Sequence, residues 1–186
     1  MSNTRKQILD LAEELIRTRG YHAFSYKDIS QQLQMKNAAI HYHFPTKEDL
    51  GIAVIQSNID QFENKREYWS SISYQEQLED FIQIYEKSRD KQWSCLIGAL
   101  SSSVDALPDS MQEKLTEMAD FILDQLTITL NEGEQKGEFR FQEQPRAKAE
   151  LIISSLLSSL LLDKVMKENV FDSIKNSIIQ SVISNN

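Results

Sequence analysis

The segment SYKDISQQLQMKNAAIHYHFPTKEDL, residues Ser25–Leu50, contains the signals of two short helices separated by a brief turn. Ser25 is followed three residues later by Asp28, the spacing at which a hydroxyl and a carboxylate cap the first turn of a helix. A second short helix is predicted over Asn37–His43. Pro45 ends it, because the residue before a proline resists the α conformation. Two short helices joined by about three residues are typical of a helix-turn-helix.

Longer helices are predicted on both sides of this segment. The preceding stretch TRKQILDLAEELIRTRG begins at a possible cap, Thr4, and ends at Gly20, where a left-handed residue is favoured. Its apolar residues follow the spacing of one buried helix face. They are Ile8, Leu11, Ala12, Leu15 and Ile16. After the segment, Thr46 and Asp49 repeat the capping spacing and open a helix that could continue toward Trp69.

The rest of the chain also predicts helices. Their expected ranges are 74–91, 94–106, 108–135, 145–167 and 170–184, the last ending at Ser184. The pairs Leu107-Pro108 and Glu132-Gly133 supply breaks. The stretch EFRFQEQ, 138–144, alternates apolar and polar residues and is where a short extended piece is expected. The fold class is therefore all-α, with about nine helices.

The charge of the chain is unevenly distributed. The 186 residues carry a net charge of −8, yet residues 1–50 hold 7 Lys and Arg against 6 Asp and Glu, a net +1. The remaining residues hold 13 against 22, a net −9. All three histidines also lie in the first 50 residues. Such asymmetry favours an N-terminal part that approaches an anionic partner.

Other features exclude several classes of protein. One Cys excludes a disulfide framework and is compatible with a reducing cytoplasm, and no signal peptide is expected. The most apolar run, Leu151–Leu162, has only 12 residues and four serines, too short for a membrane span of about 20. No G-x-S-x-G, P-loop, G-x-G-x-x-G or H-E-x-x-H motif is present, which argues against an enzyme. No cofactor or metal is expected.

The first 55 residues resemble the DNA-binding domain of the tetracycline-repressor (TetR/AcrR) family of bacterial transcription regulators. The matching pieces are ILDLAEELIRTRGYHAFSYKDIS, LQMKNAAIHYHF and PTKEDLGIAV. The resemblance implies a helix-turn-helix DNA-binding domain over residues 1–50, built on three helices, and a helical ligand-binding and dimerisation domain over residues 51–186. It also implies a second short helix that enters the major groove.

The resemblance assigns DNA-contacting roles to individual residues. Ser25 matches a capping residue that touches phosphate, Tyr42 a backbone contact, and Lys47 a phosphate-binding lysine. Lys36–Ala39 match the start of the family's helix that enters the major groove and contacts the bases. The full expected set is Ser25, Lys27, Lys36, Asn37, Ala38, Ala39, His41, Tyr42, His43 and Lys47.

Each assignment has a simpler alternative. Ser25 could serve only as a helix cap, and Lys47 could be a solvated charge. His41 and His43 are two residues apart, so they point in different directions on a helix and do not form a metal pair. The chain also departs from the family pattern, with Gln34 where Gly is common, Lys36 where Ser is common and His41 where Tyr is frequent.

The body of the chain is expected to hold a ligand pocket and a dimer interface. Aromatic and flexible side chains of the middle helices are the pocket candidates: Phe62, Tyr85, Trp93, Met118 and Phe121. The last two helices carry wide apolar faces that the resemblance assigns to a homodimer: Leu156, Leu157, Leu160, Leu161, Ile174, Ile178 and Val182. The alternatives are that both sets are ordinary core. Cys95 is either a small buried hydrophobe or an electrophile sensor.

The function that these features favour is a cytoplasmic, dimeric repressor that a small-molecule ligand releases from its operator. The expected partners are double-stranded operator DNA, a second copy of the chain and a ligand of unknown identity, with no membrane. The alternative is a DNA-binding protein that is constitutive or controlled by a partner protein.

Overall fold

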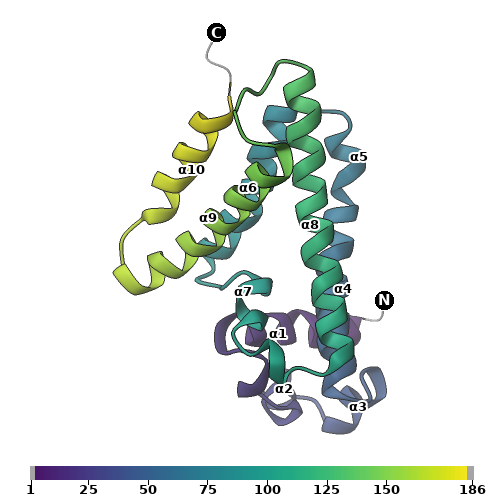
Figure 1. Cartoon of the computed structure of the whole chain (residues 1–186). Coiled ribbons are helices and arrows are strands. Elements are labelled where there is room, and N and C mark those ends of the chain that lie inside the picture. The colour runs from purple at the N-terminus through teal and green to yellow at the C-terminus, as the bar shows by residue number, and fades with distance from the viewer. Residues whose placement is uncertain (1–2, 184–186) are drawn as a thin grey trace. The chain divides into compact units, whose positions relative to one another are not determined.

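The computed structural model describes residues 3–183 and is built from helices (Figure 1). The α-helices in this range are α1 (Asn3–Arg19), α2 (Tyr26–Gln32), α3 (Asn37–His43), α4 (Lys47–Glu63), α5 (Lys65–Trp69), α6 (Tyr74–Asp90), α7 (Leu96–Ser101), α8 (Asp109–Gln135), α9 (Pro145–Met166) and α10 (Val170–Val182). Two 3₁₀ turns, Tyr21–Ala23 and Val104–Ala106, complete the order. The all-α fold class is confirmed.

The chain forms two compact units, each assembled from separate stretches of sequence. Within the described residues, the first contains 3–61 and 96–118, and the second contains 62–95 and 119–183. Segment 96–118 is therefore part of the unit that holds the helix-turn-helix. The functional boundary at residues 50 and 51 stays a prediction.

Helix α1 is the support of the first unit. The apolar stripe expected from its sequence is largely buried, with Ile8 and Ala12 0% exposed. Gly20 follows the helix with a φ of 90°, a conformation that glycine adopts at little cost. Helix α1 packs against α2, α3 and α7. It thus provides the apolar surface on which the two short helices sit.

The turn between α2 and α3 is tight. Gln34 adopts a φ of 52° there, the left-handed conformation in which glycine is favoured. Helix α3 ends at His43, and Phe44 is extended before Pro45, as the proline predicted. The turn and the proline together fix the length of α3.

Helices α6, α9 and α10 form the core contacts of the second unit, and α10 returns alongside α9 (Figure 1). The piece expected to be extended contributes one isolated antiparallel bridge, between Phe139 and Ile183. The Arg140 N–H also donates to the Val182 carbonyl at 2.8 Å. Gly133 permits this closure, because a Cβ there would lie 2.3 Å from the Phe139 ring.

Two of the predicted helices are interrupted in the structure. The helix expected to reach Trp69 is broken after Glu63, so α5 is separate. The stretch 94–106 forms a six-residue α7 and a 3₁₀ turn, not one helix. Helix α10 ends at Val182, and the predicted end at Ser184 lies outside the described residues. No helix in residues 3–183 is long and apolar enough to span a membrane.

Candidate DNA-binding surface

The two sides of α3 differ sharply in exposure. Ile40 and Phe44 point into the core and are 0% and 2% exposed. Asn37 and Ala38 are exposed at the start of the helix, and Tyr42 is 83% exposed. Tyr42 therefore lies on the solvent-facing side of α3, away from the buried Ile40. This side of α3 is therefore available for contact with another molecule.

Lys36 is the residue immediately before α3 and is exposed, with its backbone extended. Its side chain makes no capping hydrogen bond, unlike the serine that is common there in the resembled family. A cation at this end is unfavourable for the helix dipole, and a nearby phosphate would offset that effect. Ala39, in the first turn of α3, is half-buried.

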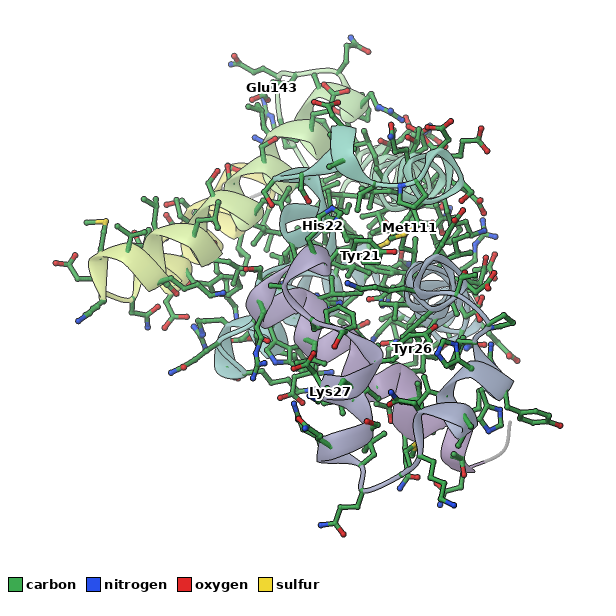
Figure 2. The ribbon with its side chains drawn as sticks, turned by 90° about the horizontal axis from the view of Figure 1, so that it is seen from below. Tyr21, His22, Tyr26, Lys27, Met111 and Glu143 are labelled. Carbon is green, nitrogen blue, oxygen red and sulfur yellow. The ribbon has the colours of Figure 1, made fainter. Side chains whose placement is uncertain are left out.

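Ser25 caps α2 in the way its spacing predicts. Its backbone N–H and its hydroxyl both donate to Asp28 Oδ2, at 2.7 and 2.6 Å. These hydrogen bonds lower the pKa of the Asp28 carboxyl. A phosphate contact by Ser25 stays a prediction. Lys27, the second residue of the same helix, is exposed (Figure 2).

Lys47 is held inside the first unit by other groups. Its ammonium donates to the Phe24 carbonyl at 2.5 Å and lies 4.6 Å from the Tyr21 ring centroid and 4.4 Å from that of Phe24. Burial lowers the pKa of Lys47, and the charge of Asp28 opposes that shift. The side chain therefore joins α4 to the loop before α2. The phosphate contact expected of Lys47 stays a prediction.

The two histidines of α3 have different neighbours. The His41 ring meets Tyr26 edge-on at 4.8 Å, and its Nδ1 lies 3.1 Å from the Pro45 carbonyl oxygen. The His43 ring meets Tyr42 edge-on at 5.1 Å. Among the described residues, no group of three or more His, Cys, Asp and Glu side chains could hold a metal ion.

Tyr26 is a positioning residue that the sequence reasoning missed. Its hydroxyl donates to the Phe44 carbonyl at 2.9 Å and also contacts the Thr46 carbonyl, so α2 is tied to the α3–α4 junction (Figure 2). Burial, and then the charge of Asp49, raise the pKa of Tyr26 to about 12. The sequence could have indicated this role, because a tyrosine that is buried needs a hydrogen-bond partner for its hydroxyl.

The start of α8 completes the first unit and was also missed. Gly51 of α4 has no side chain, and a Cβ there would lie 2.5 Å from the Met111 methyl carbon and 3.1 Å from the Tyr21 ring (Figure 2). The Ser110 hydroxyl donates to Glu48 Oε1 beside it. These contacts join residues 60 positions apart, beyond the reach of local sequence patterns.

Comparison with known proteins agrees with this geometry. The family described as "Bacterial regulatory proteins, tetR family" matches residues 8–54, which span the helix-turn-helix. A TetR transcriptional regulator from Legionella pneumophila is 33% identical, with 99% of each chain covered and a TM-score of 0.87. The chain belongs to the TetR family. TetR-family proteins are DNA-binding transcriptional regulators.

Two other TetR-fold relatives are more distant. The fatty acid metabolism regulator protein of Bacillus subtilis is 24% identical over 189 residues, covering 96% of this chain and 93% of its own. The structure of a Bacillus subtilis transcriptional regulator, FadR, in complex with stearoyl-CoA is 21% identical and covers 94% of this chain and 95% of its own. Its TM-score is 0.70, so it shares the fold.

The ligand-pocket candidates of this TetR-family chain have different neighbours. Phe62 and Tyr85 both pack on Phe81, with ring centroids 6.1 and 5.6 Å away. Phe121 lies beneath the Arg66 guanidinium, and Lys91 lies over Trp93, at 5.9 and 4.2 Å. Met118 belongs to the first unit and the other four to the second. A ligand-binding role for these five stays a prediction.

The expected interface residues divide into buried and exposed sets. Leu156, Leu160, Ile178 and Val182 are at most 6% exposed and fill the core of the second unit. Leu157 and Ile174 are half-buried, and Leu161 is 54% exposed. Within the single chain, these first four residues are therefore ordinary core, which was the alternative to an interface role. Leu161 remains available to a partner.

Proposed function

We propose that the chain is a homodimeric repressor, acting in the cytoplasm, that binds an operator through α3 and is released by a small-molecule ligand. The observation that supports it is the solvent-facing side of α3, where Tyr42 is 83% exposed. A helix of this kind presents its first residues to base edges in the major groove, while other side chains contact phosphates. Family membership supports regulation in place of catalysis.

Two DNA-binding domains that bind one palindromic operator require a dimer with two-fold symmetry, with half-sites about 34–36 Å apart. Helix α9 offers a suitable face. Leu151, Ser154, Ser158, Leu161 and Val165 are all exposed and alternate at spacings of three and four residues. This is the spacing of a helix face that packs on another helix, and serines allow close approach. We infer that this face of α9 packs against a second copy of the chain.

The ligand response has separate support. The relative solved with stearoyl-CoA shows that this fold can hold a small molecule. The chain also has a groove of about 370 Å³ in its second unit. A ligand that binds one conformer better than another shifts the population and so changes DNA affinity.

The DNA-binding proposal is tested by fluorescence anisotropy with the DNA that flanks the chain's own gene. Tyr42→Ala should weaken binding roughly tenfold on every sequence, because it removes a backbone contact. Asn37→Ala should change which bases are preferred. Wild-type affinity should also fall steeply between low and physiological salt, since phosphate contacts release counterions.

Tyr68→Ala is the matched control, since Tyr68 is also exposed, at 55%, but lies on α5. It should bind DNA as the wild type does. Equal losses for Tyr42→Ala and Tyr68→Ala would contradict the placement of the DNA surface on α3. Nearly salt-independent binding would contradict phosphate contact altogether.

A further inference from the structure

The groove of about 370 Å³ lies among α5, the start of α6 and the C-terminal half of α8, all within the second unit. Its volume is in the range of small-molecule sites. On α8 the lining residues Gln125, Ile128, Thr129 and Glu132 are spaced by three or four positions, so they form one face of the helix. Gln125 and Glu132 are seven residues apart, about 10 Å along the axis.

The Glu132 end of the groove is anionic. The Tyr74 hydroxyl donates to Glu132 Oε2 at 3.2 Å, and Glu138 also lines the groove. Burial, the hydrogen bond to Glu132 and the charges of Glu132 and Glu138 raise the pKa of Tyr74. No lysine, arginine or histidine within residues 3–183 lines this end.

The anionic end is shaped by the backbone as well as by side chains. A Cβ on Gly133 would lie 3.0 Å from the Tyr74 Cβ and closer still to the Phe139 ring. Glycine therefore lets the start of α6 approach α8 here, which brings Tyr74 against Glu132. Glu138 is held in place as well, since its Oε2 accepts from the Gln75 N–H at 3.1 Å.

At the opposite end lies Arg66, which is the one cation among the described residues that line the groove. Arg66 Nε donates to Gln125 Oε1 at 3.1 Å, and the guanidinium lies 5.9 Å from the Phe121 ring centroid. Trp69, Ile72 and Ile128 contribute apolar surface to the lining. Gln77 and Thr129 are bonded to each other at 3.1 Å.

We propose that this groove binds a small organic monocation, with its ammonium group between Glu132 and Glu138 beside Tyr74 and its apolar body along Ile128 and Ile72. Two carboxylates attract one positive charge, and a phenol next to them adds a face for cation–π contact. Arg66 repels a second charge, so a diamine is disfavoured. The role of this ligand as a releasing signal rests on the proposed function, but its binding does not.

The test is isothermal titration calorimetry of the full chain, without DNA, with benzylammonium chloride at 0.15 M ionic strength. Sodium benzoate and potassium chloride are the matched probes. Benzylammonium should give a saturable isotherm, and the other two should not. Glu132→Gln and Glu138→Gln keep a hydrogen-bond acceptor for Tyr74 and for the Gln75 N–H while removing the charge, so each should weaken binding about tenfold.

Glu134→Gln controls for the general negative charge of the chain, because Glu134 is exposed on α8 but does not line the groove. It should bind benzylammonium as the wild type does. The site assignment is overturned if benzylammonium gives no saturable heat, if benzoate binds as well, or if the two groove variants bind unchanged. Operator binding is measured separately, so loss of one activity leaves the other interpretable.

Discussion

At the scale of single residues, Tyr26 shows how one hydroxyl positions the DNA-binding helix. It bonds the carbonyls of Phe44 and Thr46, the two residues on either side of Pro45. Tyr26→Phe removes these bonds and should lower the free energy of unfolding at pH 8 by about 1 kcal/mol. Urea denaturation measures this, and Tyr42→Phe, on an 83% exposed side chain, should change nothing.

The effect of Tyr26 should also depend on pH in a defined direction. The fold raises the pKa of Tyr26 from 10.0 to about 12, so it favours the neutral phenol. That stabilisation is complete below pH 10 and is lost between pH 10 and 12, where the unfolded tyrosine ionises first. The stability difference between the wild type and Tyr26→Phe should therefore shrink on going from pH 8 to pH 11. A constant difference would contradict the assignment.

At the scale of elements, α1 and α4 are joined by a cluster of polar side chains. Asn58 is 6% exposed and accepts from Arg17 Nη2 at 2.6 Å, while its own amide donates to Glu13 Oε1 at 3.2 Å. Asn58→Ala leaves these charged groups with fewer partners and should lower the free energy of unfolding by about 1–3 kcal/mol. Denaturant titration measures the loss.

The control for this element is Gln61→Ala, an exposed position of the same helix. It should change stability by less than about 0.5 kcal/mol. If the two variants are equally stable, the cluster does not hold α1 on α4. The same cluster fixes the rotation of α4 about its own axis, since only one rotation brings Asn58 to Glu13.

At the scale of the whole molecule, the proposed dimer buries an exposed face of α9, so a charge introduced on that face should weaken the dimer. Leu161→Asp should weaken self-association at least tenfold, because the new charge loses water in the interface. Helix content should be kept, since Leu161 is 54% exposed in the single chain. Sedimentation velocity and circular dichroism measure the two. Tyr68→Asp, at a 55% exposed position on α5, should remain dimeric. An unchanged Leu161→Asp dimer would put the interface elsewhere.

The sequence by itself determined the local architecture of the DNA-binding part. The Ser25–Asp28 cap, the end of α3 before Pro45 and the position of Gly20 could all be predicted because each depends on residues at most a few positions apart. The predicted pairing of Thr46 with Asp49 is likewise present, with the Thr46 N–H donating to Asp49 Oδ2 at 2.9 Å. Such bonds form within one turn of helix.

Only the tertiary structure decided what each exposed-looking or apolar side chain does. Lys47 reads as a free cation, yet aromatic rings from a loop more than 20 residues away cover it. Leu160 and Leu161 both belong to the apolar face predicted from the sequence, yet Leu160 is 3% exposed and Leu161 is 54% exposed. The physical reason is that burial depends on which remote element packs against a helix. A broad apolar face does not specify which of its sides that element covers.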